Sequence, residues 1–249
     1  MNRWRKLARI FVTTLLVVAL LGAGGTAYWV SRTYPASDLA LQALPSDARV
    51  TVAEQNGIIT FEPVGMRAAT GFIFYPGAGV DYRAYAPILR QIAERGYFVA
   101  LAHVPLNLAF FRADAATEVM ERFPAIEVWA VGGHSLGGVA ASEYAAKNVD
   151  RVGGLILWAS YPADDSLAAT NIPVLSIYGT NDMAGVERFV QSQSQLPADA
   201  QFVVIEGGNH SQFGSYGLQN GDNPASISAE EQWLQAAEAT VQFLMSLTP

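Results

Sequence analysis

The sequence predicts a single α/β domain, with a mostly parallel sheet covered by helices on both faces, preceded by one apolar N-terminal helix. From about residue 49 onward, short apolar runs alternate with amphipathic stretches of helical period, and this alternation is typical of an open α/β sheet. The apolar runs are nearly continuous, as expected for strands that are buried on both faces. The chain has 249 residues, which suits one such domain, since some α/β folds use about 200–250 residues in one piece.

The N-terminal part consists of a basic segment and an apolar segment. Residues 1–9 carry four basic side chains and no acidic one, and residues 10–30 carry no charge. A helix of that apolar length covers roughly 30 Å, the thickness of a bilayer core. We therefore expect a transmembrane signal anchor, with the basic segment in the cytoplasm and the rest of the chain outside. One alternative is a cleaved signal peptide and a secreted domain, because Gly22–Gly25 and Ala27 are small enough for a cleavage site. The other is a buried core helix.

A spacer and then the domain are expected after the apolar segment. Residues 31–48 contain two prolines, which break any long helix, and residues 49–249 hold the predicted sheet. The domain is expected to open with a hairpin, because Asn56-Gly57 lies between two β-prone runs. The predicted hairpin strands cover residues 50–53 and 58–61, the later strands 71–75, 97–102, 128–131, 155–159, 174–178 and 202–205, and the helices 84–95, 113–123, 136–147, 186–195 and 229–247.

The composition excludes several classes of function. The chain has no cysteine, which rules out a disulfide scaffold, a thiolate nucleophile and a cysteine-ligated metal site. Beyond residue 9 there are 11 basic and 22 acidic side chains. This part of the chain therefore lacks the basic surface that binds phosphate backbones, and we expect no nucleic-acid partner.

A serine motif follows one of the predicted strands. In an open α/β sheet the ligand site lies beyond the carboxyl ends of the strands, and at one such end Gly133, Ser135 and Gly137 form the pattern G-x-S-x-G. A strained turn of this kind lifts the serine hydroxyl above the sheet edge, and the two glycines avoid collisions with the neighbouring strand and helix. We predict Ser135 as a nucleophile and the amide of Leu136, at the helix start, as an oxyanion donor.

A serine nucleophile needs a base, and the chain has three histidines. His134 adjoins the serine, so its side chain should point away from the site, and His103 precedes the nucleophile in the chain. Where this type of turn carries the nucleophile, the acid and then the histidine follow it in sequence. His210 comes after the last predicted strand and satisfies that order. We therefore predict His210 as the base.

The predicted base needs a carboxylate that fixes its tautomer. Asp182 follows the predicted strand over residues 174–178 and lies between the nucleophile and the base in chain order. We predict Asp182 as this acid. Asp164 and Asp165 follow the preceding strand and are the alternatives.

The small-residue loop over residues 76–80 is expected to supply a second oxyanion donor. We predict the amide of Ala78 in this role, with Gly79 as the alternative. The loop lacks a P-loop lysine and the third glycine of a dinucleotide site, so it does not predict nucleotide binding. No metal or organic cofactor is expected, because the surroundings of Asp222 lack the spaced carboxylates of a calcium loop and are interpreted as a turn.

Four segments together resemble the α/β-hydrolase superfamily, namely residues 76–79, 133–137, 179–182 and 208–210. The stretches YPGAGVDYRAYAPILRQIAERGYFVALAHVPLNLAFF and IEGGNHSQFGSYGLQNGD more closely resemble a bacterial membrane-anchored branch related to dienelactone hydrolases and small esterases. The resemblance covers roughly residues 50–247, and it departs at Pro76, where many relatives carry a histidine. It implies the α/β-hydrolase fold and a serine hydrolase that acts on small carboxylic esters through an acyl-enzyme.

The resemblance leaves two other functions open: an acyltransferase that uses the same triad, and a membrane-tethered binding domain without activity. Relatives that act on lipid droplets carry a cap after the strand that follows the nucleophile helix. Only 14 residues separate the two predicted strands there, so no cap domain is expected, and the site should accept short to medium acyl esters. We expect aromatic side chains of two loops to line it, with ordinary packing onto the sheet as the alternative. These side chains are Phe110, Phe111, Phe213 and Tyr216.

Overall fold

The computed structural model describes residues 31–247 and, before them, residues 7, 11, 14–15, 24–25 and 29. The predicted basic segment and most of the predicted membrane helix over residues 10–30 lie outside the described residues. Within the described residues, no helix is both long enough and apolar enough to cross a bilayer. The chain divides into two compact units, Met1–Thr33 and Tyr34–Pro249, and the second unit contains the sheet.

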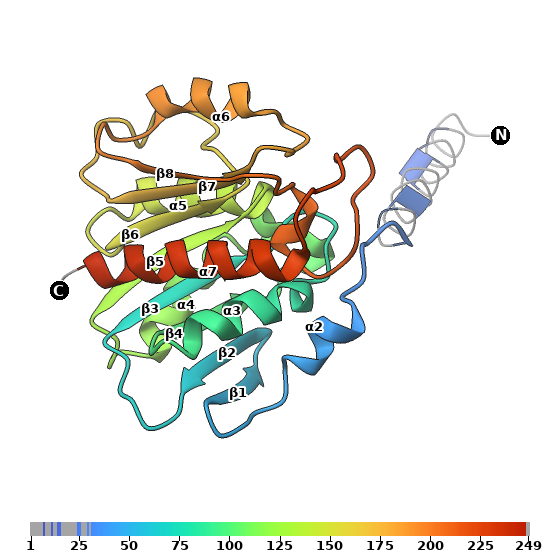
Figure 1. Ribbon diagram of the computed structural model, residues 1–249. Helices are drawn as coiled ribbons and strands as arrows, with labels where there is room; N and C mark the ends of the chain where they lie inside the picture. The colour runs from blue at the N-terminus through green and yellow to red at the C-terminus, as the bar shows by residue number, and fades with distance from the viewer. Residues whose placement is uncertain are drawn as a thin grey trace. The chain divides into compact units, whose positions relative to one another are not determined.

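In the described part of the chain, one eight-stranded sheet forms the centre of this second unit (Figure 1). Its strands follow the order β1-β2-β4-β3-β5-β6-β7-β8. The pairs β1–β2 and β2–β4 are antiparallel, and the remaining pairs are parallel. The strands are β1 (Val50–Gln55), β2 (Ile58–Pro63), β3 (Thr70–Tyr75), β4 (Phe98–Ala102), β5 (Val128–His134), β6 (Gly154–Trp158), β7 (Val174–Gly179) and β8 (Gln201–Ile205). The predicted mostly parallel sheet is confirmed.

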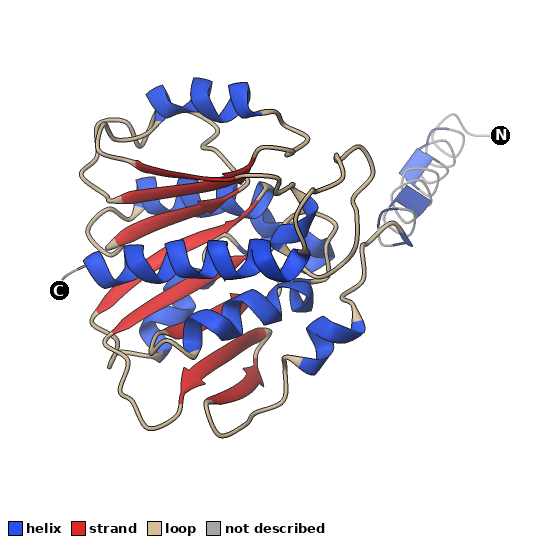
Figure 2. Cartoon of the chain, in the orientation of Figure 1, coloured by secondary structure: helices blue, strands red, loops and turns tan. Residues whose placement is uncertain are grey.

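Helices cover both faces of this sheet (Figure 2). Side chains of α3 and α7 pack on one face and those of α4 and α5 on the other. Within β3, Phe72 and Phe74 join the first core and Ile73 and Tyr75 the second, because successive side chains of a strand point to opposite faces. The helices are α2 (Asp38–Gln42), α3 (Ala86–Ala93), α4 (Ala115–Arg122), α5 (Leu136–Lys147), α6 (Val186–Ser192) and α7 (Ala229–Ser246), with short 3₁₀ turns η1 (Tyr82–Tyr85), η2 (Pro105–Asn107), η3 (Ala109–Arg112), η4 (Gln193–Gln195) and η5 (Ser211–Phe213).

The predicted hairpin is confirmed. Gln55 pairs with Ile58, and the two residues between them, Asn56 and Gly57, have φ angles of 53° and 69°. Positive φ at both central positions is the conformation of a type I′ turn, whose twist matches that of the strands it joins. Asn-Gly is the dipeptide that tolerates this conformation best, which is why the hairpin was predictable.

The expected spacer contains structure that the sequence pattern did not indicate. The backbone of Tyr34 pairs with that of Val80, and α2 begins after Ser37, whose Oγ accepts a hydrogen bond from the Ala40 amide. The same hydroxyl lies 2.6 Å from the Oγ of Ser215. Residues from Tyr34 onward therefore belong to the same compact unit as the sheet. A serine before an acidic first turn is a helix-start signal, but a helix of five residues depends on such long-range contacts.

Candidate active site

A strained turn joins β5 to α5 at the carboxyl edge of the sheet. Ser135 occupies this turn with φ 51° and ψ −124°, a conformation that a residue with a side chain adopts only where its surroundings enforce it. Two hydrogen bonds hold the turn: the Ser135 amide donates to the carbonyl of Trp158 at 3.0 Å, and the Ser160 hydroxyl donates to the carbonyl of Ser135 at 2.6 Å. Ser135 in this turn lines the pocket described below.

The turn requires glycine on both sides of the serine. A Cβ atom at Gly133 would lie 2.6 Å from the carbonyl oxygen of Tyr75, and one at Gly137 would lie 2.3 Å from the same oxygen. Real Cβ atoms do not approach a backbone oxygen so closely, so only glycine lets the end of β3 pass against the first turn of α5.

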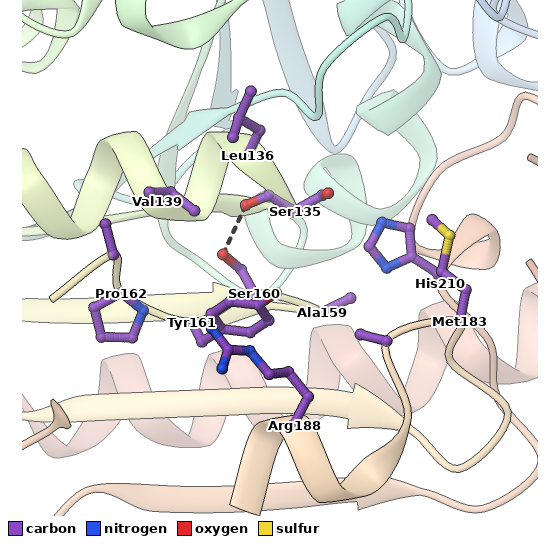
Figure 3. A pocket seen from close by; sticks show the side chains of 12 residues that line it. Ser135, Leu136, Val139, Ala159, Ser160, Tyr161, Pro162, Met183, Arg188 and His210 are labelled. Carbon is purple, nitrogen blue, oxygen red and sulfur yellow. Dashed lines mark hydrogen bonds between the residues drawn. The ribbon is translucent and has the colours of Figure 1, made fainter. Parts of the chain in front are cut away.

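The structure brings His210 and Asp182 together beside this turn. The Nδ1 of His210 lies 3.0 Å from Oδ2 of Asp182, and the two residues are 5% and 2% exposed. The other carboxylate oxygen accepts a hydrogen bond from the Ala184 amide at 2.8 Å. Within the described residues the Nε2 of His210 has no hydrogen-bond partner, and Figure 3 shows a Ser135 oxygen directed toward the His210 ring across the pocket. An ionised carboxylate accepts from Nδ1–H, which leaves Nε2 free to accept a proton.

The alternative residues lie elsewhere. His103 is exposed and stacks on Tyr82, with ring centroids 4.6 Å apart. Asp164 and Asp165 are exposed in the loop after β6, where Asp164 accepts a hydrogen bond from the Ser166 amide. Among these candidates, the structure joins only Asp182 to His210.

His134 lies directly behind His210, with ring centroids 4.5 Å apart. Burial, followed by the neighbouring His210 ring, holds the pKa of His134 well below its usual range, so this second imidazole stays neutral. Its Nδ1 lies 2.9 Å from the hydroxyl oxygen of Tyr85, which also accepts a hydrogen bond from the Gly77 amide at 3.0 Å. Because Tyr85 accepts from Gly77, its one proton is available to His134. The end of β5 before the strained turn and the loop after β3 are thus connected through the buried side chains of His134 and Tyr85.

The amides of the loop after β3 differ in whether they have a hydrogen-bond acceptor. The Gly77 amide donates to Tyr85, and the Gly79 amide donates to the carbonyl of Asn107 at 3.0 Å. Between them, the Ala78 amide has no hydrogen-bond acceptor within the described chain. The Leu136 amide, in the first turn of α5, is likewise without an acceptor there. The geometry therefore favours Ala78 over Gly79 as a donor to a bound group, together with Leu136.

Asp222 connects the segments that carry the predicted acid and base. Its Oδ1 accepts a hydrogen bond from the Met183 amide at 3.1 Å, and its Oδ2 accepts from the amide and hydroxyl of Ser211 at 2.8 and 2.5 Å. Met183 follows Asp182, and Ser211 follows His210. The sequence indicated a turn at Asp222, but this contact spans 39 residues to Met183, and no local pattern signals it. No group of three or more metal-ligating side chains occurs in the described chain.

Replacing Asp222 by alanine is expected to destabilise the fold by about 2–4 kcal/mol, because it leaves two buried donors on Ser211 and a partly buried one on Met183 without acceptors. The thermal midpoint should fall by roughly 5–15 °C, as measured by circular dichroism. The matched control is Asp164→Ala, since Asp164 is exposed and accepts hydrogen bonds only locally. Equal midpoints for the two variants would contradict this role of Asp222.

A pocket of about 420 Å³ opens in front of Ser135 and His210. Its walls include Val139, Tyr161, Met183 and Arg188 (Figure 3). The aromatic lining predicted from two loops is wrong: Phe110 and Phe111 are 43% and 61% exposed, Phe213 and Tyr216 are buried, and none of the four lines the pocket. Phe213 is instead stacked on His134 at 5.8 Å. Tyr161 was missed, although it comes soon after the end of β6, where a site residue is expected.

A comparison with family profiles gives the class of the protein. The sequence profile of the alpha/beta hydrolase family matches residues 71–234, and the chain belongs to this family. Comparison with curated proteins gives no match.

Several solved structures are similar in fold. A dienelactone hydrolase from Anabaena variabilis aligns with a TM-score of 0.59 and 16% identity, over 82% of this chain and 99% of that one. Est1E from Butyrivibrio proteoclasticus aligns with a TM-score of 0.57 and 14% identity, over 80% and 100%. A thermostable esterase from Pseudomonas putida aligns with a TM-score of 0.56 and 13% identity, over 84% and 88%. At these identities the similarity shows the fold.

Proposed function

We propose that the chain is a serine hydrolase that acts on carboxylic esters through Ser135, His210 and Asp182. The observation that carries the proposal is the contact between His210 Nδ1 and Asp182 Oδ2 at 3.0 Å, where His210 lines the same pocket as Ser135 in its strained turn. Nucleophile, base and orienting carboxylate are the three parts that acyl transfer by an activated serine needs. Similarity to an esterase and a dienelactone hydrolase supports an ester as the substrate.

In the proposed reaction the Ser135 hydroxyl oxygen attacks the ester carbonyl carbon while Nε2 of His210 takes its proton. The Leu136 and Ala78 amides donate to the oxyanion, and each such donor is typically worth about 3–4 kcal/mol in the transition state. His210 then gives the proton to the leaving alcohol oxygen as the carbon–oxygen bond breaks, which leaves an acyl-enzyme. Water, deprotonated by His210, attacks this acyl-enzyme and releases the acid and the free serine. Asp182 orients the ring and stabilises its charged form.

Active-site labelling tests this proposal directly. A fluorophosphonate should attach to the purified protein at Ser135, as identified by mass spectrometry of the modified peptide, and p-nitrophenyl esters should be hydrolysed. A folded protein that neither takes the label nor hydrolyses these esters would contradict the proposal and favour the binding domain without activity. Transfer of the acyl group to an added alcohol in preference to water would favour the acyltransferase.

Short and medium acyl chains are expected to be the better substrates. The pocket has a volume of about 420 Å³, and residues 160–173, where a cap would be inserted, contain no helix. A small pocket buries only a limited apolar length, so turnover should be higher for chains of about two to eight carbons than for long ones. Rates across a series of p-nitrophenyl esters check this. A sharp rise in rate above the solubility limit, or a preference for sixteen-carbon chains, would contradict it.

We further propose that residues 10–30 anchor the chain in a membrane, with the hydrolase domain outside the cytoplasm. This rests on the uncharged run and on the basic side chains before it. The full-length protein should sediment with membranes and resist alkaline extraction, and a protease added to spheroplasts should digest the domain. Recovery in the soluble cytoplasmic fraction would contradict the anchor, whereas a shortened chain in the medium would favour the cleaved signal peptide.

A further inference from the structure

The active-site pocket contains one unusual feature, an arginine. Apart from Ser135, His210 and Ser160, the pocket is lined by apolar and small side chains, by Tyr161 and by Arg188, and no carboxylate lines it. Arg188 is therefore the one permanently charged group in a wall that otherwise suits an apolar ester.

Arg188 is exposed at the pocket mouth, and its guanidinium has an aromatic partner and no acidic one. It comes from α6 and lies over the ring of Tyr161, with Cζ 4.4 Å from the ring centroid (Figure 3). The Tyr161 ring is itself held by Phe189, at 6.0 Å, and Phe189 stacks on Tyr178 at 4.3 Å. Stacking on an aromatic face orients the planar guanidinium while its edge N–H groups remain available.

Several other arginines form ion pairs, although Arg67, Arg95 and Arg122, outside the pocket, form none within the described residues. Within the described residues, carboxylates pair with Arg49, Arg83, Arg90, Arg112 and Arg151. In the same residues no hydrogen bond or ion pair joins the Arg188 guanidinium to the protein, although Glu187 is its neighbour in sequence and acidic side chains outnumber basic ones beyond residue 9. A donor fork that stacks on Tyr161, has no acidic partner and lines the same pocket as Ser135 fits a planar or tetrahedral anion bound there.

We propose that Arg188 is an anion-binding subsite and that the ester substrate carries a carboxylate or phosphate group, which the guanidinium binds while Ser135 attacks the ester carbonyl. The inference rests on the proposed esterase function for the reacting end of the substrate. It adds the chemical class of the group at the other end of the substrate, an anion. The substrate would thus be an anionic ester, held at two points.

Matched pairs of esters test this inference. One arm compares p-nitrophenyl hemiesters of dicarboxylic acids of about four to six carbons with the neutral esters of equal length. The second compares short-chain acylglycerol phosphates with the corresponding acylglycerols, so that the two arms distinguish a carboxylate from a phosphate. The measured quantity is the ratio of kcat/KM for the anionic and the neutral ester, which cancels any loss common to both.

In at least one arm the wild-type protein should prefer the anionic ester, and Arg188→Gln should lower the ratio about ten- to a hundredfold, mainly through KM. Arg188→Lys keeps the charge but loses the planar fork, and should give an intermediate ratio. Arg151→Gln removes the same charge at an exposed position outside the pocket, and should leave the ratio at the wild-type value. Added salt should lower the ratio in the wild type and have little effect in Arg188→Gln.

Binding in the absence of turnover separates this inference from the proposed reaction. Calorimetry on Ser135→Ala should show that adding Arg188→Gln raises the Kd for the preferred anionic ester at least about tenfold. If the wild type hydrolyses no ester but this binding difference is present, the reaction is wrong and the subsite stands. If neither arm shows a preference that depends on Arg188, and binding to Ser135→Ala is unaffected, the subsite is wrong.

Discussion

Replacing Ser135 by alanine is expected to lower ester turnover at least about a thousandfold without unfolding the protein. The Ser135 hydroxyl is directed toward His210, and the remaining serine that lines the pocket, Ser160, uses its hydroxyl to donate to the Ser135 carbonyl. No second serine hydroxyl of the pocket is therefore free to take over the attack. The backbone of the turn is held by its own hydrogen bonds to Trp158 and Ser160, so the loss of one side-chain oxygen should leave it in place.

The measurement is the rate on p-nitrophenyl butyrate together with the thermal midpoint. Ser166→Ala is the matched control, because Ser166 is an exposed serine in the loop after β6, and it should retain wild-type turnover. Fluorophosphonate labelling should be lost in Ser135→Ala and retained in the control. Substantial turnover by a folded Ser135→Ala protein would show that another group is the nucleophile.

The second large effect is expected for His210→Ala. The Nε2 of His210 is the ring nitrogen that faces the pocket beside Ser135, whereas the His134 ring lies behind it and is bonded to Tyr85. Without a base the serine hydroxyl is a weak nucleophile, so turnover should again fall about a thousandfold or more. Residues that act as one unit are strongly non-additive. The double variant Ser135→Ala/His210→Ala should therefore be no slower than Ser135→Ala alone.

His103→Ala is the control for this second prediction. His103 is exposed and stacked on Tyr82, and its removal should change turnover less than about twofold, within the range of a surface substitution. The decisive comparison is between the two histidine variants under identical conditions. A similar loss in both, or a further large loss in the double variant, would contradict the assignment of His210 as the base.

The elements that could be predicted from the sequence are those whose signal is local. The strands β3 to β7 are buried on both faces, so each reads as a short apolar run. The helix α5 covers the residues predicted for it, Leu136–Lys147. The positions of Ser135, Asp182 and His210 could be predicted for a related reason: each comes soon after a strand of the same sheet, and the carboxyl ends of parallel strands meet at one edge.

The residues that line the pocket could not be predicted, because they depend on the backbone path of the loops. Ala159, directly after β6, has a φ of 46°, and an alanine in the sequence gives no sign of such a left-handed conformation. Tyr161, two residues further on, lines the pocket. The loop after His210 instead places Phe213 against His134 and Trp158. Both aromatic residues follow a strand end in the sequence, and only the path of the backbone decides which of them faces a substrate.

The contact between Gly137 and the end of β3 has a further consequence for electrostatics. The carbonyl oxygens of Tyr75 and Pro76 lie so close to Gly137 that no Cβ atom fits there, so the segment leading to the Ala78 amide packs directly against the helix turn bearing the Leu136 amide. Dipoles fixed in this way need little reorientation as negative charge develops on a substrate oxygen, whereas water dipoles have to reorganise. For the proposed reaction we therefore expect a low reorganisation free energy, because folding has already oriented the two donors.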